Sequence, residues 1–354
     1  MRIAVAALGF LLLATIVADA IQTVVVARHA RKVPLITRLL SQFTWVPFAG
    51  IGRLFRSESR RENYLGLYGP LSLLMLLGFW AISLIVAFAI LQWSAEADLN
   101  LPRLVRSLYL SAGTFFTLGS SEPQHTLSKL LMVIEAGFGF TFLGLVIGYL
   151  PVLYQSYSSR ELRILFLDAR AGSPPSAAEF LTRVGRNPEK LAERLAQWEE
   201  WSLDLLQCHL SYPMLAYYRS QHANQSWLGA LTTIVDVSAL VMLGSSDDLK
   251  QQAEFTFAAG RHALVHTASI FHLQPDSIPE PRLKGEDFSR LCDAISNARS
   301  PLRADQISKP ELQKLMSTYE PYARALSSYF LMALPPCMPD APTLPNWQVR
   351  VWGS

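Results

Sequence analysis

The residues of this chain whose types and spacing could do chemistry lie close together in the segment 114–122, which has the sequence Thr-Phe-Phe-Thr-Leu-Gly-Ser-Ser-Glu. Thr117 can offer a hydroxyl and a carbonyl oxygen, and Leu118 and Gly119 can offer carbonyl oxygens. A selective ion pore strips water from a cation and replaces it with protein oxygens of this kind. Because glycine reaches backbone angles closed to other residues, Gly119 can help to point successive carbonyls toward one axis. The segment therefore predicts a filter for cations.

Elements able to position such a segment flank it on both sides. Three apolar stretches, 3–27, 71–93 and 127–154, are long enough to cross about 30 Å of hydrocarbon. A short amphipathic stretch, 102–116, predicts a pore helix whose partly negative C-terminal end faces the permeating cations. Non-helical backbone is tolerated at membrane depth only where it lines water or is buried in protein. The order of span, dipping helix, loop and span is therefore the layout of a pore.

The composition fits a membrane part joined to a cytosolic part. The 354 residues are 51% hydrophobic and 17% charged, with a mean hydropathy of +0.23, too apolar for an ordinary soluble protein and too charged for one that is all membrane. Cys208, Cys292 and Cys337 have no metal-binding spacing and indicate reduced thiols in the cytosol. Basic residues follow the 3–27 stretch, whereas a signal peptide carries them before its apolar run, so we expect a retained span.

Basic residues near the spans predict the orientation. Those between the first and second apolar stretches are Arg28, Arg31, Lys32, Arg38, Arg53, Arg56, Arg60 and Arg61. This loop is therefore expected in the cytoplasm, which places the N-terminus outside, opens the filter segment to the outside and leaves the C-terminal domain inside. We expect the membrane to be a bacterial inner membrane.

The filter segment and its surroundings resemble a known family. Pore-loop potassium channels carry the motif Thr-x-x-Thr-Val-Gly-Tyr-Gly-Asp between two membrane helices. The residues of this chain that match the motif are Thr114, Thr117, Leu118 and Gly119, with Glu122 in the place of its acidic residue. Residues 130–136, Leu-Leu-Met-Val-Ile-Glu-Ala, resemble the start of the inner helix in bacterial two-helix channels. The resemblance covers residues 70–155, under a third of the chain.

The resemblance implies a homotetramer whose four loops surround one pore, with K⁺ and also Na⁺ as candidate permeant ions and no bound cofactor or metal. The filter residues it implies are Thr117, Leu118, Gly119, Ser120 and Ser121, supported by Thr114 and Glu135. Ser120 and Ser121 depart from the motif, in which Tyr and a second Gly stand at these places. A positive φ at Ser121 would cost about 1 kcal/mol. We therefore expect a wider, wetter mouth and only weak preference for K⁺ over Na⁺.

Three acidic residues lie in or beside the predicted spans. Glu122 would form a ring of carboxylates that draws cations to the outer mouth, or would brace the loop through a hydrogen bond. Glu135 lies within the third span, where a carboxylate is costly and therefore a functional candidate. We expect it to brace the filter from behind instead of touching the ion. Asp19 in the first span either pairs with another span or reaches water near an interface.

Glycines in the third span allow two roles. A hinge at Gly139 or Gly144 would let the inner helix bend and open a gate, whereas small residues at the same places would allow tight packing between subunits. The two roles are compatible, and close packing is the favoured one.

The basic linker 28–69 has apolar residues near helical spacing between its charges. It predicts either an amphipathic helix lying on anionic lipid around the pore or an ordinary helix packed against the cytosolic domain. We favour the membrane surface.

The C-terminal part is expected to be a helical cytosolic domain with no nucleotide-binding glycine motif, no catalytic constellation and no nucleic-acid partner. The stretch 227–243 is almost as apolar as a span but short, and it contains Asp236, so it predicts a buried core helix. The stretch 217–226 is dense in hydrogen-bonding groups and is a candidate ligand pocket or subunit contact. His262 and His266 share a helical face, where core or surface histidines are the more common case than a metal pair.

The sequence as a whole predicts an all-α membrane protein with three transmembrane helices and a re-entrant pore loop. Its expected parts are an N-terminal helix, 1–27, the linker, 28–69, the pore domain, 70–157, and the cytosolic domain, 158–354. The expected function is a tetrameric cation channel. The alternative, from another class, is a non-conducting membrane sensor or scaffold that acts through its cytosolic domain on an unknown ligand or partner.

Overall fold

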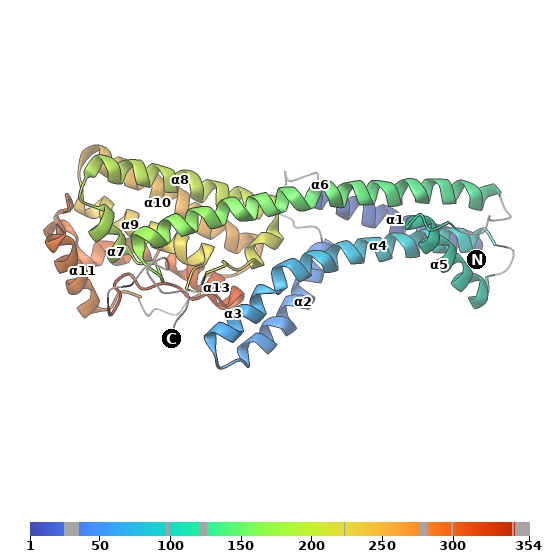
Figure 1. The fold of residues 1–354 in the computed structure, drawn as a ribbon, viewed down its shortest axis with the longest axis horizontal. Helices are drawn as coiled ribbons and strands as arrows, with labels where there is room; N and C mark the ends of the chain where they lie inside the picture. The colour runs from blue at the N-terminus through green and yellow to red at the C-terminus, as the bar shows by residue number, and fades with distance from the viewer. Residues whose placement is uncertain are drawn as a thin grey trace, which may run out of the picture. The chain divides into compact units, whose positions relative to one another are not determined.

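The computed structural model describes residues 1–24, 35–96, 99–119, 126–222, 224–276, 282–298, 300–341 and 343. Every regular element within these ranges is a helix. The predicted all-α class is therefore confirmed, and the chain is seen as a ribbon in Figure 1.

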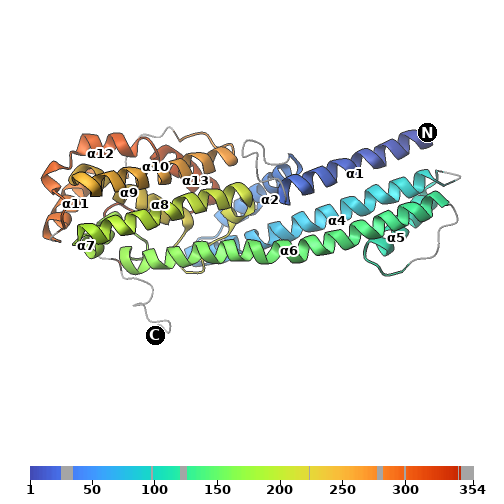
Figure 2. The ribbon, with the colours of Figure 1, turned by 90° about the horizontal axis from the view of Figure 1, so that it is seen from above.

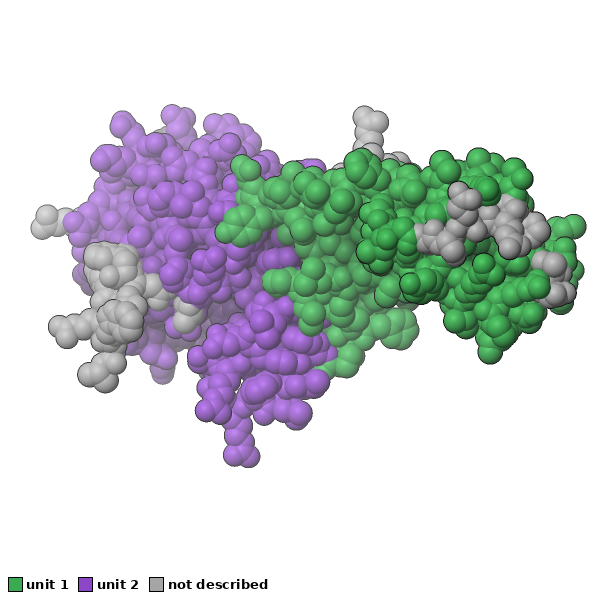
Figure 3. All heavy atoms as spheres, turned by 45° about the vertical axis from the view of Figure 1, so that its right-hand side comes forward, with its two compact units in different colours: residues 1–47, 70–155 green, residues 48–69, 156–354 purple. Residues whose placement is uncertain are grey.

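Two compact units divide the chain, and Figure 3 colours them separately. Unit 1 comprises residues 1–47 and 70–155, and unit 2 comprises residues 48–69 and 156–354. The second half of the expected linker thus belongs to the same unit as the C-terminal domain. Three helices, α2 (Leu35–Arg53), α4 (Tyr68–Ser94) and α6 (Thr126–Ala171), each contribute residues to both units.

Unit 1 is built from long apolar helices and one short helix, which run alongside one another in Figures 1 and 2. The helices with residues in this unit are α1 (Arg2–Val24), α2 (Leu35–Arg53), α4 (Tyr68–Ser94), α5 (Leu101–Phe115) and α6 (Thr126–Ala171). Pro151 lies inside α6, which continues well past the apolar stretch that the sequence marks.

Helix α1 packs antiparallel on α4. The indole nitrogen of Trp80 donates a hydrogen bond of 2.9 Å to the carboxylate of Asp19, and both side chains are buried. Nearer the start of α1, a methyl group added at Gly9 would lie 3.0 Å from the side chain of Leu91. Asp19 therefore pairs with another span, as one of its two predicted roles requires.

Four segments of the described chain are long and apolar enough to cross a membrane, which is consistent with a membrane protein. They are Arg2–Val24, Glu58–Ser94, Thr126–Ala171 and Trp227–Gly244. The last differs from the others because 89% of its most apolar window is buried inside the protein. The predicted buried core helix at 227–243 is therefore confirmed.

Unit 2 surrounds that buried helix, α9, with other helices, and α8, α9 and α10 lie side by side in Figures 1 and 2. Its helices besides the shared ones are α3 (Glu58–Gly66), α7 (Ala177–Val184), α8 (Pro188–Ser211), η1 (Pro213–Tyr217), α9 (Trp227–Gly244), α10 (Asp247–Ile270), α11 (Gly285–Asn297), η2 (Ala304–Gln306), α12 (Lys309–Met316) and α13 (Glu320–Phe330). Side-chain caps start three of them, because Ser176, Asn187 and Ser226 each accept a hydrogen bond from a backbone N–H of the first turn.

The end of α2 and helix α3 form a hairpin that belongs to unit 2. The rings of Phe48 and Tyr64 stack with centroids 4.2 Å apart, and Glu62 pairs with Arg219 at 3.3 Å. Burial lowers the pKa of Arg219 to about 10, although the charge of Glu62 opposes this. This half of the linker therefore packs against the C-terminal domain, as the second of the two predictions for the linker requires. On the first half of α2, Phe43 and Val46 are exposed, so the lipid-surface hypothesis stays a prediction for that segment.

A buried cluster of charged and polar groups ties α9 to later parts of unit 2. Arg282 donates hydrogen bonds to Asp236 at 2.6 Å and to Glu320 at 2.9 Å. Tyr319 donates to Asp236 as well, and the free thiol of Cys337 lies 3.4 Å from its other oxygen. Because carboxylates in a protein core are costly unless paired and hydrogen-bonded, Arg282 is the group that makes this cluster tolerable.

His209 predicts a pH dependence of stability in unit 2. Its ring is fully buried against Trp227, and burial, with the charge of Arg160 adding to it, holds its pKa well below 6.5. The unfolded chain takes up a proton below about pH 6.5 and the folded chain does not, so stability is full above that pH and falls by up to about 1.4 kcal/mol per pH unit below it. Denaturant unfolding of wild type and His209→Phe at pH 7 and pH 5 measures this. We expect a smaller loss between the two pH values in the variant, and equal losses would contradict the assignment.

Candidate functional site

Helix α5 provides the structural basis of the candidate site. The side chain of Asn100 caps its first turn by accepting a 3.0 Å hydrogen bond from the N–H of Arg103, and Pro102 occupies a position where no N–H is needed. Arg103 also lies 3.8 Å from Glu96. The helix predicted at 102–116 is therefore present, as Leu101–Phe115.

The small polar side chains of α5 point into unit 1, and its outward-facing residues are mostly apolar, with Arg106 exposed among them. Buried residues of the helix are Ser107, Ser111, Gly113, Thr114 and Phe115. Exposed apolar residues on and beside it are Leu101, Val105, Tyr109 and Phe116, whose exposed fractions are 71%, 58%, 79% and 56%. This is the reverse of a helix on the surface of a soluble protein. The outer face of α5 therefore suits apolar surroundings.

Glu135 connects α5 to both long helices. Its carboxyl group is fully buried; one oxygen accepts a 2.7 Å hydrogen bond from Gln92 on α4, and the other is hydrogen-bonded to the hydroxyl of Ser111 on α5. The Ser111 hydroxyl also lies 2.8 Å from the carbonyl oxygen of Ile85, to which it can donate. A hydroxyl has one hydrogen, so a neutral Glu135 that donates to Ser111 satisfies all of these groups at once. Three helices thus meet at one carboxyl group.

This network predicts different outcomes for two substitutions. Glu135→Gln keeps a carbonyl for Gln92 and supplies an amide N–H for Ser111, so it should fold and assemble close to wild type. Glu135→Ala leaves buried donors and a cavity, and we expect a loss of about 2–4 kcal/mol. Thermal unfolding of the purified protein in detergent measures both. Equal destabilisation by Gln and Ala would show that an ionised carboxylate is required instead.

The chain leaves α5 through a tight cap. The N–H of Leu118 donates to the carbonyl of Gly113 at 2.8 Å and the N–H of Thr117 donates to that of Thr114 at 3.1 Å, a pair of bonds typical of the Schellman motif. Thr117 takes a φ of 55° and Gly119 a φ of 78°. The left-handed conformation is uncommon for a residue such as Thr117, and strain of this kind clusters at functional turns.

The predicted filter residues are partly brought together by this turn. Thr117, Leu118 and Gly119 follow one another on its exposed side. The hydroxyl of Thr114 is buried and donates back along the helix to the carbonyl of Leu110 at 2.9 Å. Ser120, Ser121 and Glu122 lie outside the described residues. The filter itself stays a prediction, with its first three oxygen-bearing residues placed at the end of α5.

The two predicted hinge glycines have different surroundings within unit 1. A methyl group added at Gly139 would lie 2.2 Å from the carbonyl oxygen of Phe115, whereas nothing lies within 4 Å of one added at Gly144. Gly139 is thus where α6 approaches the backbone of α5 closely within one chain, and packing between subunits stays a prediction. The hinge stays a prediction for both.

Sequence reasoning missed the partners of Glu135. Gln92 is a polar side chain near the end of an apolar stretch, and Ser111 lies on the small-residue face of the amphipathic helix. Gln92 and Ser111 were each visible in the sequence, since a polar residue in an apolar membrane segment needs a hydrogen-bond partner. Their convergence depends on how the helices are rotated, which spacing does not reveal.

Residues 219–222 and 224–226 of the polar stretch line a cleft of 980 Å³ within unit 2. Buried atoms of Ser220 and Gln225 have no hydrogen-bond partner among the described residues, which fits the ligand-pocket hypothesis for this stretch.

The histidines of unit 2 are not gathered into a metal site. His262 and His266 lie with ring centroids 4.1 Å apart, but the described ranges contain no group of three His, Cys, Asp or Glu side chains able to hold a metal. Elsewhere in unit 2, His209 packs on Trp227 and Asp236 accepts a hydrogen bond from Arg282.

No family model matches the chain, and neither the curated proteins nor the solved structures gave a match.

Proposed function

We propose that this chain is one subunit of a homotetrameric cation channel with a potassium-channel-like pore and weak preference for K⁺ over Na⁺. The observation that carries the proposal is α5. Its 15 residues extend about 22 Å, too short to cross the hydrocarbon. Its polar face is held by Glu135 between two long apolar helices, its outward face is mostly apolar, and it ends in the exposed residues 117–119. These are the properties of a pore helix.

A stripe on α6 supports assembly of several copies. Its members are Val133, Gly137, Phe140, Gly144 and Ile147, which recur at spacings of four and three residues. The three apolar side chains are 70%, 75% and 64% exposed, and methyl groups added at the two glycines would meet nothing within 4 Å. Apolar and small residues at this spacing favour helix packing in membranes. The stripe therefore suits contact between the α6 helices of neighbouring subunits.

The proposed arrangement in the membrane follows from charge. The basic loop after α1 lies in the cytoplasm, the N-terminus lies outside, and unit 2 lies inside a bacterial cell. α5 dips from the outer side, and the negative end of its dipole favours cations in the pore. Binding in unit 2 can reach the pore because α6 contributes to both units.

Reconstitution tests this proposal directly. The purified protein in liposomes should carry K⁺ and Na⁺ with a reversal potential that shifts little when one ion replaces the other, and native mass spectrometry should give a tetramer. The variant Ser120→Tyr/Ser121→Gly restores the motif and should raise the preference for K⁺. A strongly K⁺-selective wild type would contradict the weak filter, and a dimer with no flux would contradict the channel.

The second candidate is a non-conducting membrane sensor. The cleft with its unpartnered Ser220 and Gln225 favours it, since these groups suit a bound ligand. If the protein is such a sensor, we expect a dimer that carries no ion flux and whose thermal stability changes when small molecules are added. The channel proposal does not predict this result.

A further inference from the structure

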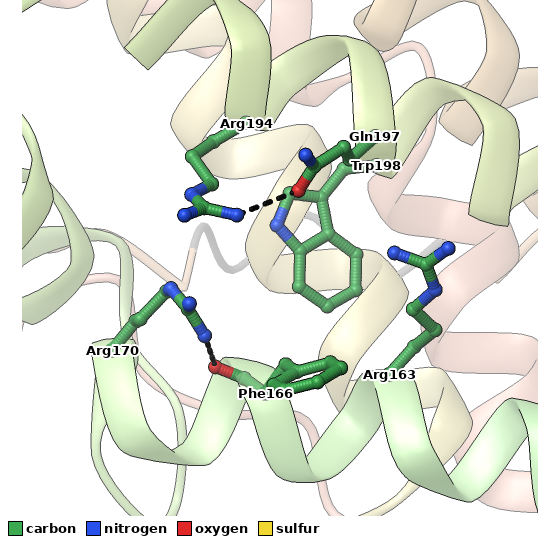
Figure 4. Close-up of a pocket in the computed structure, with 6 residues that line it drawn as sticks. All are labelled: Arg163, Phe166, Arg170, Arg194, Gln197 and Trp198. Carbon is green, nitrogen blue, oxygen red and sulfur yellow. Dashed lines mark hydrogen bonds between the residues drawn. The ribbon is translucent and has the colours of Figure 1, made fainter. Parts of the chain in front are cut away.

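A second pocket in unit 2 has a strongly basic lining. Its volume is 230 Å³, and among the described residues it is lined by Arg163, Phe166, Arg170, Arg194, Gln197 and Trp198. Figure 4 shows the three guanidinium groups around the space between two helices, with the rings of Phe166 and Trp198 between them. The lining contains three positive charges and no carboxylate.

Helical spacing explains why these side chains meet. Arg163, Phe166 and Arg170 are three and four residues apart on one face of α6, and Arg194, Gln197 and Trp198 are likewise close together on one face of α8. The pocket therefore lies between two facing helix surfaces, each of which carries an aromatic ring and at least one arginine.

The arginines have unused donors. Arg194 donates to the side-chain oxygen of Gln197 at 2.8 Å, and Arg170 donates to the carbonyl of Phe166 at 2.7 Å. Neither forms an ion pair with a carboxylate of the described chain, and Arg163 has neither a hydrogen bond nor an ion pair there. Since each guanidinium carries five N–H donors, most of the donors around this pocket have no hydrogen-bond partner among the described residues.

The three guanidinium groups of the pocket repel one another because they carry like charges. A multivalent anion bound between them would be attracted to all three and would offset this repulsion. Guanidinium groups bind phosphate oxygens in pairs of parallel hydrogen bonds. We propose that this pocket binds a phosphate group, with the rings of Phe166 and Trp198 as apolar walls for the organic part of a phosphate ester. The volume suits a phosphate or diphosphate group and is too small for a large cofactor.

The position of the pocket gives binding a consequence, which rests on the function proposed above. Arg163 and Arg170 lie on the same helix as the stripe 133–147, so a phosphate that joins α6 to α8 would bias the inner helix of the channel. Binding and ion flux are measured separately below, so that the failure of one is distinguishable from the failure of the other.

Calorimetric titration of the full-length protein in detergent tests the site. The soluble probe is inorganic pyrophosphate and the lipid probe is dioctanoyl phosphatidylglycerol below its micellar concentration. The variants are Arg163→Gln, Arg170→Gln and Arg194→Gln, and the control is Arg186→Gln, an exposed arginine of the same unit outside the pocket. We expect each pocket variant to weaken binding about tenfold or more and the control to bind as wild type.

The outcomes separate the sources of the phosphate. Arginine-dependent binding of pyrophosphate alone identifies a soluble phosphate ligand, and arginine-dependent binding of the lipid probe identifies a headgroup. Absence of binding by both probes, or equal weakening by all four variants, overturns the site. Thermal unfolding of each variant confirms that it is folded, and Arg163→Lys, which keeps the charge and loses the paired bonds, should bind at an intermediate level. Flux with and without pyrophosphate then tests the coupling by itself.

Discussion

Substituting alanine for Gly139 is expected to destabilise unit 1 and to abolish ion flux. The added methyl group would lie 2.2 Å from a backbone oxygen of Phe115, and a backbone atom cannot rotate away as a side chain can. Either α5 or α6 must move, which costs about 1–3 kcal/mol or more and displaces the exposed turn at residues 117–119. Thermal unfolding and liposome flux of the same preparation measure the two effects.

Gly148→Ala is the matched control for this substitution. It changes the same residue type on the same helix, but nothing lies within 4 Å of the added methyl group. Because alanine is the better helix former, the control should gain about 0.5–1 kcal/mol. Opposite signs for the two variants are the expected result. If Gly139→Ala behaves as Gly148→Ala does, the close approach of α6 to α5 is wrong.

Replacing Arg282 by methionine is expected to cause the largest loss of stability in unit 2. Methionine fills much of the space, but Asp236 remains in the core without a counter-ion and Glu320 keeps only Arg324, which lies 3.2 Å away. Breaking a buried pair in this way costs about 3–5 kcal/mol, which corresponds to a fall in Tm of about 10 °C for a unit of this size. Thermal unfolding followed by circular dichroism measures it.

Arg290→Met is the control, since it removes an arginine of the same unit from a partly exposed pair. Arg290 lies 3.1 Å from Asp287 and its side chain is 39% exposed, so the loss should stay within about 1 kcal/mol. Restoring stability in Arg282→Met by the second substitution Asp236→Asn would identify the uncompensated carboxylate as the cause. Equal losses in the two single variants would contradict the role given to the cluster.

Helices could be predicted well because their signals are local. Apolar runs located α1, α4 and the first part of α6, and the short length with Asp236 inside it identified α9 as a core helix. The apolar stretch did not show where α6 ends: the stretch stops at 154, and the helix continues through Pro151 to Ala171. Hydropathy marks where apolar surroundings would end, whereas a helix ends only where its hydrogen bonds do.

The site was less predictable because it depends on rotation and approach. The amphipathic pattern of α5 showed two faces without revealing that Ser111 turns inward and Tyr109 outward. Glu135 was expected to brace the filter from behind. The sequence did not show which residues would be its partners, because these lie on two other helices. The arginines of the phosphate pocket are seven residues apart on α6 and on a separate helix, so no sequence motif brought them together.

Asp236 also bears on how the chain is made. Its partners in the core come late: Arg282 follows it by 46 residues, Tyr319 by 83 and Cys337 by 101. At about 5–20 residues per second, α9 leaves the ribosome seconds before any of them. During that interval an apolar segment with the composition of a membrane span carries an unpaired carboxylate near its centre. A carboxylate there opposes insertion by the translocon by about 2.5–3.5 kcal/mol. Asp236, which pairs with Arg282 in the folded unit, therefore opposes insertion of α9 into the bilayer while the chain is being made.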